Sequence, residues 1–491
     1  MRIPHFSVIF SLILLACQPS PTQQQETSTQ PPNIIFILAD DLGWADLPVY
    51  GNHFNEAPNL DRLAANGMRF TNAYAASAVC SPTRASIISG QYPARVGIID
   101  FITGHWRPYE QVTVPINRTQ YLPLDTYTMG ELMKDAGYTT GYFGKWHLGG
   151  KDHYPEKQGF DQSVVFRGFQ FIDIGEKLDP PQDIPKDKYL AEALTDLSLD
   201  FIDQHKQEPF FLFLSHFDVH VPLDADSAAI QKYLNKPKVA GYPSNAIYAG
   251  MIEAIDRSLG RIMNKLEAEG LDQNTMILFF SDNGGLVKRF DDKPAIADRR
   301  MDIYPNDTLR IIATSNAPLR AEKGTLYEGG IREPLIVSWP RQIQAGSVSH
   351  TPATSVDFIP TFAAISGVDL PQHQVFDGQS ILPQLLGQSP VQDRALYWHY
   401  PVYHHDVPAS AVRLGNWKLI ENLVDGSTAL YNLSIDPGEL DDLSQQETAK
   451  RDELQAMLSA WRAEVGARLP VENPDFDPEK RHEWGQHPDR K

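Results

Sequence analysis

The stretch NIIFILADDLG, residues 33–43, decides the fold of this chain. Its first seven residues form a near-continuous apolar run of strand length, and Asp40 and Asp41 follow directly. Two further runs have the same character, FFLFLS at residues 210–215 and TMILFFS at residues 275–281. Strands that are apolar on both faces are typical of the centre of a parallel sheet that helices cover on both sides.

Helical patterns lie between these strands. Apolar residues recur at helical spacing over residues 190–201 and 248–266, which predicts two amphipathic helices. Strands that alternate with helices favour an α/β fold, with a doubly wound and mostly parallel sheet flanked by helices.

The C-terminal part has a different pattern. From about residue 385, short strand candidates are followed by one helix, whose apolar face carries Leu454, Leu458 and Trp461. We therefore expect a main α/β domain over residues 33–385 and a smaller α+β subdomain over residues 386–491, with an antiparallel sheet and one packed helix. The strand candidates are residues 395–399, 411–413 and 417–421.

The N-terminal residues 1–17 have the features of an export signal. Arg2 precedes an apolar run that is too short to span a bilayer, and LLAC at residues 14–17 resembles a bacterial lipoprotein signal. The expectation is an exported lipoprotein of the bacterial cell envelope, lipidated at Cys17, with residues 18–32 as a flexible polar tether. Membrane contact is then expected only through the lipid anchor. An ordinary cleaved signal is the alternative.

The composition limits the classes of partner. The chain has 491 residues, 43 Lys and Arg against 62 Asp and Glu, and a formal net charge of −19. Such an acidic chain is not expected to bind nucleic acid, and an anionic substrate would need a local pocket of basic groups or metal.

Acidic and amide side chains follow two of the predicted central strands. Asp40 and Asp41 come after the first strand, and Asp282 and Asn283 come after the strand at residues 275–281. In open α/β sheets the carboxyl ends of the strands form the ligand crevice. Oxygen ligands point to a hard cation, Ca²⁺ or Mg²⁺, and helix capping is the alternative role for each pair.

Cys80 is one of only two cysteines in the chain. If Cys17 carries lipid, Cys80 has no disulfide partner, although exported proteins usually pair their thiols. It opens the run CSPTR at residues 80–84. Three alternatives are open for the Cys80 thiol: it is buried and inert, it is reactive, or it has been converted chemically.

These segments together resemble the type I, formylglycine-dependent sulfatases of the alkaline phosphatase superfamily, which include arylsulfatases and bacterial polysaccharide sulfatases. CSPTR is similar to the family signature, and the other blocks occur in the family's order. They are NIIFILADDLG (33–43), GYFGKWHLG (141–149), the segment 210–223, SDNGG (281–285), KGTLYEGGIREP (323–334) and LYNLSIDPGEL (430–440).

The resemblance implies a catalytic domain over residues 33–385 and a sulfuric ester hydrolase. Cys80 would be oxidised to formylglycine (3-oxoalanine) by a formylglycine-generating or anaerobic maturation enzyme, and its gem-diol would attack sulfur. One Ca²⁺ would be held by Asp40, Asp41, Asp282, Asn283 and the modified Cys80. The remaining roles would fall on Arg84 and Lys145, which fix the diol, on His147, which takes a proton, and on His220 and Lys323, which hold the sulfate. His216 does not match the block position and is left out.

Two other functions stay open beside sulfate ester hydrolysis. A phosphomonoester or phosphonate hydrolase of the same superfamily would share the sheet and the metal crevice, although Asn283 and the absence of histidine ligands argue against a two-metal phosphatase site. A non-catalytic sulfoglycan-binding lipoprotein would keep Cys80 as a thiol.

The expected substrate is a sulfated oligo- or polysaccharide. An exported acidic enzyme suits algal glycans such as carrageenan, ulvan or fucoidan, with glycosaminoglycans next. Basic and aromatic residues between the blocks are candidates for contact with the sugar, and core packing is the alternative for WHYPVYHH at residues 398–405. The candidate residues are His105, Arg107, Arg289, His399, His404 and His405.

Overall fold

A computed structural model describes Met1 and residues 31–291, 293–388 and 393–490. The predicted signal with Cys17, and the predicted tether as far as residue 30, lie outside the described residues. Within the described part, no helix combines the length and the apolar character needed to cross a bilayer.

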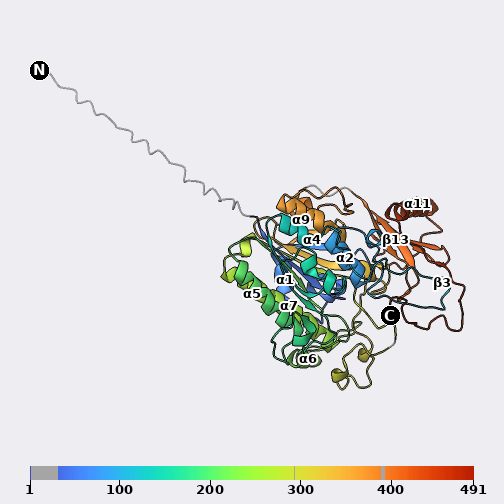
Figure 1. The fold of residues 1–491 in the computed structure, drawn as a ribbon, viewed down its shortest axis with the longest axis horizontal. Helices are drawn as coiled ribbons and strands as arrows, with labels where there is room; N and C mark the ends of the chain where they lie inside the picture. The colour runs from blue at the N-terminus through green and yellow to red at the C-terminus, as the bar shows by residue number, and fades with distance from the viewer. Residues whose placement is uncertain (2–30, 292, 389–392, 491) are drawn as a thin grey trace.

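A large mixed sheet forms the centre of the molecule (Figure 1). The pairings of β1 with β7 and β8, of β4 with β5 and β7, and of β2 with β10 and β11 are parallel. The strand β9 runs antiparallel to both β2 and β8, and β6 runs antiparallel to β5. In order across the sheet, the strands are β10 (Ser347–Ser349), β2 (Met68–Tyr74), β9 (Arg332–Ser338), β8 (Thr275–Ser281), β1 (Asn33–Ala39), β7 (Phe210–Ser215), β4 (Thr139–Lys145), β5 (Gln162–Phe166) and β6 (Leu178–Asp179), while β11 (Ala353–Thr354) pairs with β2.

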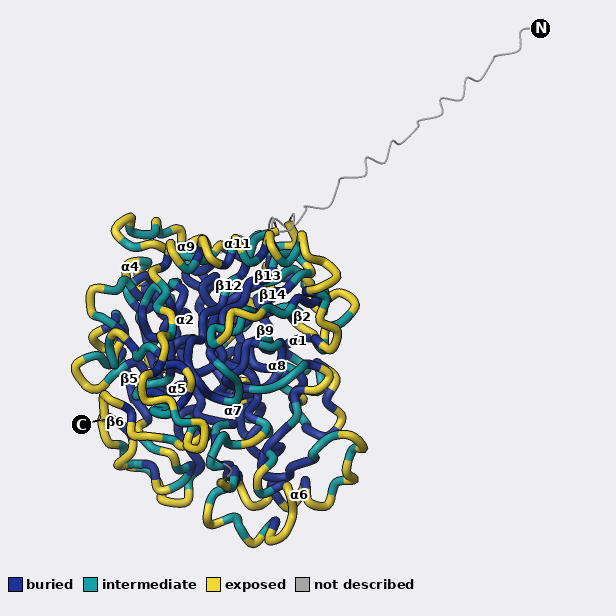
Figure 2. Tube along the Cα trace, turned by 90° about the vertical axis from the view of Figure 1, so that its right-hand side faces the viewer, coloured by how far each residue is buried: buried dark blue, intermediate teal, exposed yellow. Residues whose placement is uncertain are grey.

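Two hydrophobic cores lie on opposite faces of this sheet. Side chains of β1 alternate between them, so that Ile35 and Ile37 belong to one core while Ile34 and Phe36 belong to the other. Helices cover both faces, as Figure 1 shows, and the tube in Figure 2 is buried throughout its centre. One face carries α1 (Pro58–Ala65), α5 (Leu190–His205), α6 (Ser227–Leu234) and α7 (Ala246–Ala268), and the other carries α2 (Cys80–Ser89), α4 (Met129–Asp135), α9 (Phe358–Ser366) and α10 (Leu382–Leu385).

The C-terminal part contains a four-stranded antiparallel sheet with one long helix packed on it. Leu454, Leu458 and Trp461 of the helix pack against Val412 and Leu419 of the sheet. The elements are β12 (Ala395–Tyr400), β13 (Ala409–Leu414), β14 (Trp417–Asn422), β15 (Thr428–Asn432) and α11 (Thr448–Val465). Two short helices, α3 (Pro93–Val96) and α8 (Glu328–Ile331), lie in connecting segments, and β3 (Val112–Thr113) pairs with β16 (Val471–Glu472).

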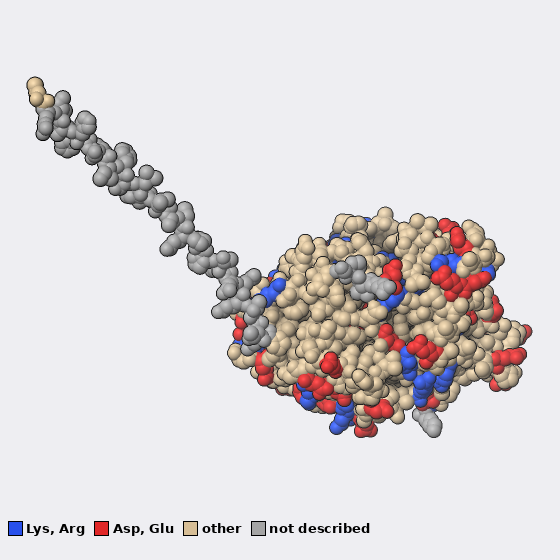
Figure 3. Space-filling model, turned by 90° about the horizontal axis from the view of Figure 1, so that it is seen from above, with Lys and Arg blue, Asp and Glu red and all other residues tan. Residues whose placement is uncertain are grey.

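The predicted fold class is confirmed, because the protein is α/β with a mostly parallel central sheet, flanking helices and a smaller antiparallel sheet. On the face shown in Figure 3, acidic and basic side chains are interspersed, and no broad basic field covers it.

Candidate active site

Two acidic or amide pairs meet at the carboxyl ends of adjacent strands. Ala39, the last residue of β1, is paired in register with Ser281, the last residue of β8. Asp40 and Asp41 follow the first strand, and Asp282 and Asn283 follow the second, and all four side chains are buried. Asp41 has a φ of 63°, in the left-handed region that non-glycine residues rarely adopt. Such backbone strain is typical of functional sites, and here it turns the chain sharply after β1.

Cys80 is the first residue of α2, and the whole of this helix is buried. Burial raises the pKa of its thiol, although Lys145 and Lys323 oppose that effect. One turn further along, Arg84 points to the same side and reaches Asp282, with its Nε 2.8 Å from Oδ2. The helix therefore places Cys80 and a buried guanidinium beside the carboxylates.

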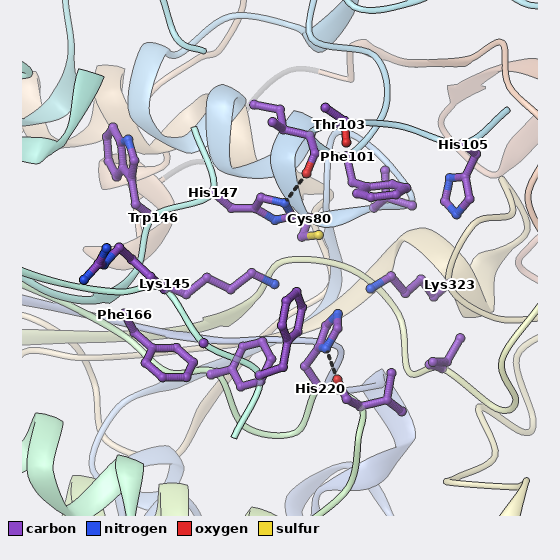
Figure 4. A pocket seen from close by; sticks show the side chains of 18 of the residues that line it. Cys80, Phe101, Thr103, His105, Lys145, Trp146, His147, Phe166, His220 and Lys323 are labelled. Atoms are coloured by element: carbon purple, nitrogen blue, oxygen red, sulfur yellow. Dashed lines mark hydrogen bonds between the residues drawn. The ribbon is translucent and has the colours of Figure 1, made fainter. Parts of the chain in front are cut away.

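Two lysines neutralise two of the carboxylates. The Nζ of Lys145, the last residue of β4, lies 2.5 Å from Oδ2 of Asp40, and the Nζ of Lys323 lies 2.6 Å from Oδ1 of Asp41. Burial raises the pKa of both carboxyls, but the neighbouring positive charges outweigh it and hold each pKa below its usual value. Figure 4 shows the two lysines reaching from opposite sides toward the space next to the Cys80 sulfur.

Two histidines complete this group. His147 has a φ of 58°, and its Nε2 donates a hydrogen bond of 2.8 Å to the carbonyl oxygen of Ile102. Its Nδ1 is buried and has no hydrogen-bond partner among the described residues. His220 places Nε2 3.7 Å from Oδ2 of Asp41. Burial lowers the pKa of His147 well below its usual value and that of His220 to about 4, so both rings are neutral at pH 7.

These side chains lie at a cavity of about 400 Å³. Its lining combines basic and aromatic residues, and among the residues that the structure describes no Asp or Glu belongs to it. A basic pocket in an acidic chain attracts an anion, and aromatic rings suit the faces of a sugar. The basic residues of the lining are His105, Lys145, His147, Arg167, His220, Arg289, Lys323, His404 and Arg490, and its aromatic residues are Phe101, Trp146, Tyr154, Phe166, Phe169, Phe217 and Phe290.

The carboxylate group fits a divalent cation. Potential ligand atoms of Asp40, Asp41 and His220 lie within 4.8 Å of one another. Oδ1 of Asp40, Oδ2 of Asp41 and Oδ1 of Asn283 are buried and have no hydrogen-bond partner among the described residues. Buried oxygens of this kind are costly unless a donor or a cation satisfies them. Three buried oxygens without a partner, at the ends of two adjacent strands, therefore suit a hard cation.

The predicted substrate-binding residues fall into two groups. His105, Arg289 and His404 line the cavity. His405 is outside the lining, and its Nδ1 lies 2.7 Å from Nδ1 of His404 and 2.9 Å from the carbonyl oxygen of Lys323.

Arg107 and His399 lie outside the cavity lining among the described residues. Arg107 stacks on the ring of Trp484, 4.1 Å from its centroid, and contacts Glu110. His399 is buried in β12, where its ring nitrogens bond Ser410 and the carbonyl oxygen of Arg468. His216, which the block position excluded, is also fully buried and does not line the cavity.

Sequence reasoning missed much of the cavity wall. Phe166 ends β5, and Arg167 and Phe169 follow it at the same carboxyl edge of the sheet that holds Asp40. The position after a parallel strand could have indicated these residues. No comparable sequence pattern indicates that Phe101 and Arg490 line the cavity.

Basic side chains around a buried carboxylate cluster at a strand-end crevice define a hydrolase site for an anionic ester. Residues 32–368 match the family model described as Sulfatase, and residues 321–464 match the one described as N-sulphoglucosamine sulphohydrolase, C-terminal. The chain belongs to the sulfatase family and is a sulfuric ester hydrolase.

Relatives of known name agree with this assignment. A sulfatase of Formosa agariphila is 33% identical over 92% of both chains. N-acetylgalactosamine-6-sulfatase of Rattus norvegicus is 34% identical over 79% of this chain and 71% of its own length. The crystal structure of Ps i-CgsB is similar with a TM-score of 0.74 and 28% identity, covering 91% of this chain and 95% of the other. Phosphonate monoester hydrolase of Agrobacterium radiobacter, at 18% identity and a TM-score of 0.63, shares the fold alone.

Proposed function

We propose that this sulfatase removes sulfate from a sulfated carbohydrate, using a formylglycine made from Cys80 and one bound Ca²⁺. The observation that carries the proposal is the position of Cys80. It lines the floor of the basic cavity together with Lys145, His147, His220 and Lys323.

The thiol itself is poorly suited to attack an anionic ester. Burial raises its pKa, so the thiolate is disfavoured, and a thiolate would also meet the carboxylates of Asp40 and Asp282. A formylglycine supplies a hydrated aldehyde whose hydroxyl is the nucleophile and whose second hydroxyl allows sulfate to leave. Conversion requires a maturation enzyme in the producing cell.

Asp40, Asp41, Asp282 and Asn283 are the proposed Ca²⁺ ligands, together with the converted residue 80. The three unpartnered oxygens of Asp40, Asp41 and Asn283 support this set, and oxygen donors favour Ca²⁺ over zinc. Bound Ca²⁺ would lower the pKa of the nucleophile and offset charge on the sulfate. Without it, Asp40, Asp41 and Asp282 are balanced by the positive charges of Arg84, Lys145 and Lys323.

The remaining side chains have roles that follow from their protonation. His147 is neutral with a free Nδ1, so it can accept the proton whose removal drives sulfate release. Asp41 raises the pKa of Lys323 above its usual value despite burial, so Lys323 stays charged and can hold a sulfate oxygen. Burial lowers the pKa of His220 to about 4, and a bound anion would raise this pKa toward the range of a general acid.

A carbohydrate is the substrate class that the cavity wall favours. Aromatic rings at Phe101, Phe166 and Phe169 offer apolar faces beside the basic floor. The related Ps i-CgsB has been solved with k-i-k-neocarrahexaose, at 28% identity to this chain. We propose a carrageenan-type or other algal glycan first and a glycosaminoglycan second.

We further propose that the protein is exported and anchored in the bacterial cell envelope through lipid on Cys17. The sequence LLAC at residues 14–17 supports this proposal. Export would bring the enzyme to polymeric substrates outside the cytoplasm.

The test is expression with a maturation enzyme, followed by mass spectrometry of the peptide that contains Cys80. The aldehyde form should appear in active preparations, and sulfate should be released from sulfated oligosaccharides. Cys80→Ala should fold normally and lose at least about three orders of magnitude in kcat. An unmodified thiol in fully active enzyme would overturn the formylglycine proposal. Faster release of phosphate than of sulfate from matched esters would favour the phosphoester hydrolase instead.

A further inference from the structure

The cavity lining carries more positively charged side chains than one sulfate ester requires. Five Lys or Arg residues line the cavity, and Lys145 and Lys323 at its floor are already paired with Asp40 and Asp41. The other three are arginines from separate parts of the chain, namely Arg167, Arg289 and Arg490.

Two of these arginines have carboxylate partners. Arg289 donates two hydrogen bonds to Asp291, at 2.8 and 2.7 Å. Arg167 places its Nε 3.6 Å from Asp179. The Asp291 pair offsets much of the charge of Arg289, whereas Asp179 also lies 3.0 Å from Nζ of Lys151 and offsets less of the charge of Arg167.

Arg490 differs from them. Its Nε donates a hydrogen bond of 3.1 Å to the hydroxyl of Thr103. In the part of the chain that the structure describes, no carboxylate forms an ion pair with Arg490, and its Nη1 and Nη2 atoms have no hydrogen-bond acceptor. One edge of a planar guanidinium is therefore available at the cavity, which is the geometry that binds carboxylate or sulfate through two parallel hydrogen bonds.

The segment that carries Arg490 is held in place along its length. We call residues 471–490 the tail segment, and in Figure 1 its dark red trace runs beside β3. It begins with the pairing of β16 and β3, and Asn473 then donates hydrogen bonds to the carbonyl oxygens of Pro108 and Glu110, at 2.9 and 2.7 Å.

Closer to Arg490, the tail segment packs on the cavity wall itself. The ring of Trp484 lies 4.6 Å from that of Phe290 and 5.5 Å from that of His105, both of which line the cavity. His487 is buried against Gly104, where an added Cβ would come within 2.7 Å of Nε2. The backbone N–H of Arg490 bonds the carbonyl oxygen of His487 at 2.9 Å, so this buried histidine fixes the position of Arg490.

We propose that Arg490 and the tail segment form a subsite that binds a second anionic group of the substrate, a sulfate or carboxylate next to the sulfate that is cleaved. The proposal rests on the proposed function for the identity of the cleaved group, and it names polyanionic rather than singly charged sugars as the preferred class. Arg490 acts as a specificity-determining residue and takes no part in the cleavage itself.

The experiment compares Arg490→Gln with Lys480→Gln. Both variants remove one positive charge from the tail segment, but Lys480 is exposed, pairs with Asp477 and does not line the cavity. The binding probe is sucrose octasulfate, measured by isothermal titration calorimetry, and the kinetic probe is 4-nitrophenyl sulfate, which has a single anionic group.

Arg490→Gln should weaken binding of sucrose octasulfate about tenfold and reduce its dependence on salt. It should lower hydrolysis of 4-nitrophenyl sulfate far less than it lowers the affinity for sucrose octasulfate and should leave the thermal unfolding midpoint unchanged, and Lys480→Gln should change none of the three. Equal affinity of the two variants for sucrose octasulfate would overturn the subsite, and so would an equal loss of affinity and of aryl sulfate hydrolysis. If the wild-type enzyme releases no sulfate, the proposed function is contradicted but the subsite is not. The comparison of sucrose octasulfate affinities needs no turnover.

Discussion

Arg84 contacts a single oxygen of Asp282, Oδ2, through both Nε at 2.8 Å and Nη2 at 2.7 Å. Its Nη1 also donates to the hydroxyl of Ser215 and to the carbonyl oxygen of Lys145. One side chain thus joins α2, which carries Cys80, to the ends of β8, β7 and β4. The position of the nucleophile relative to the carboxylates depends on this buried guanidinium.

The first prediction concerns Arg84→Lys. A lysine cannot reach the same set of acceptors, and the carboxylate of Asp282 would stay buried with a poorer partner, so the free energy of unfolding should fall by about 3 kcal/mol. Urea denaturation monitored by fluorescence measures it.

Arg95→Lys is the matched control, because Arg95 forms a similar pair with Asp377 nearer the surface. It should cost about 1 kcal/mol or less. Similar losses for both variants would mean that Arg84 has no special structural role.

The second prediction concerns the metal. Ca²⁺ should bind the wild-type protein, raise its thermal midpoint and restore activity after treatment with a chelator, because a ligand that binds only the folded state stabilises it. Asp40→Ala removes one of the three unpartnered oxygens and should abolish these effects. Calorimetric titration with Ca²⁺ and thermal unfolding are the measurements.

Asp196→Asn serves as the control for that comparison, since Asp196 pairs with Lys188 and Arg261 on the surface. Its Ca²⁺ affinity should equal that of the wild type. The site would be assigned wrongly if Asp40→Ala bound Ca²⁺ with unchanged affinity.

The third prediction is a pH dependence of stability that comes from His399. Burial lowers the pKa of this ring to about 4 in the folded state, against about 6.5 when it is exposed. The unfolded chain therefore binds a proton between these values while the folded chain does not. His399 favours folding above pH 6.5, and this contribution is lost as the pH falls toward 4.

Between pH 7 and pH 4.5 the loss should reach about 2 kcal/mol in the wild type. His399→Asn should be less stable at pH 7 but should lose about that much less on acidification, as measured from urea midpoints. His482→Asn, at an exposed position, should leave the pH dependence unchanged. An identical pH slope in His399→Asn and wild type would contradict the assignment.

The sequence could predict the central strands to the residue because their apolar runs have sharp ends. The runs at residues 33–39, 210–215 and 275–281 are β1, β7 and β8 with the same bounds. A polar pair ends the runs at residues 33–39 and 275–281 where β1 and β8 leave the sheet. The charged residues that follow could also be placed at one edge, because parallel strands end together.

The cavity wall was harder to predict for two physical reasons. Side chains of a strand alternate between faces, so Trp398 and Tyr400 lie on one face of β12 while His399 lies on the other. The histidine-rich composition of residues 398–405 does not indicate which of these side chains face the cavity. Arg490 reaches Thr103, which lies 387 positions away in the chain, through contacts of an irregular segment that has no hydrophobic period.

The fourth prediction tests how tightly the floor of the cavity is packed at Gly324, which follows Lys323. Gly324 has a φ of +81°, and a Cβ at this position would lie 2.0 Å from Nδ1 of His404. Gly426, in the turn between β14 and β15, has a similar φ of +75°, but a Cβ there would meet nothing within 4 Å. Replacement by alanine costs both sites about 1 kcal/mol of backbone strain, so comparing the two variants separates the effect of strain from that of steric displacement.

Gly324→Ala must also move His404 or Lys323, and a displacement of about 1 Å in a positioned group lowers kcat/KM about 100-fold. Gly426→Ala should lose similar stability and keep full activity toward 4-nitrophenyl sulfate. Equal activity of the two variants would mean that the position of Lys323 is not critical for cleavage.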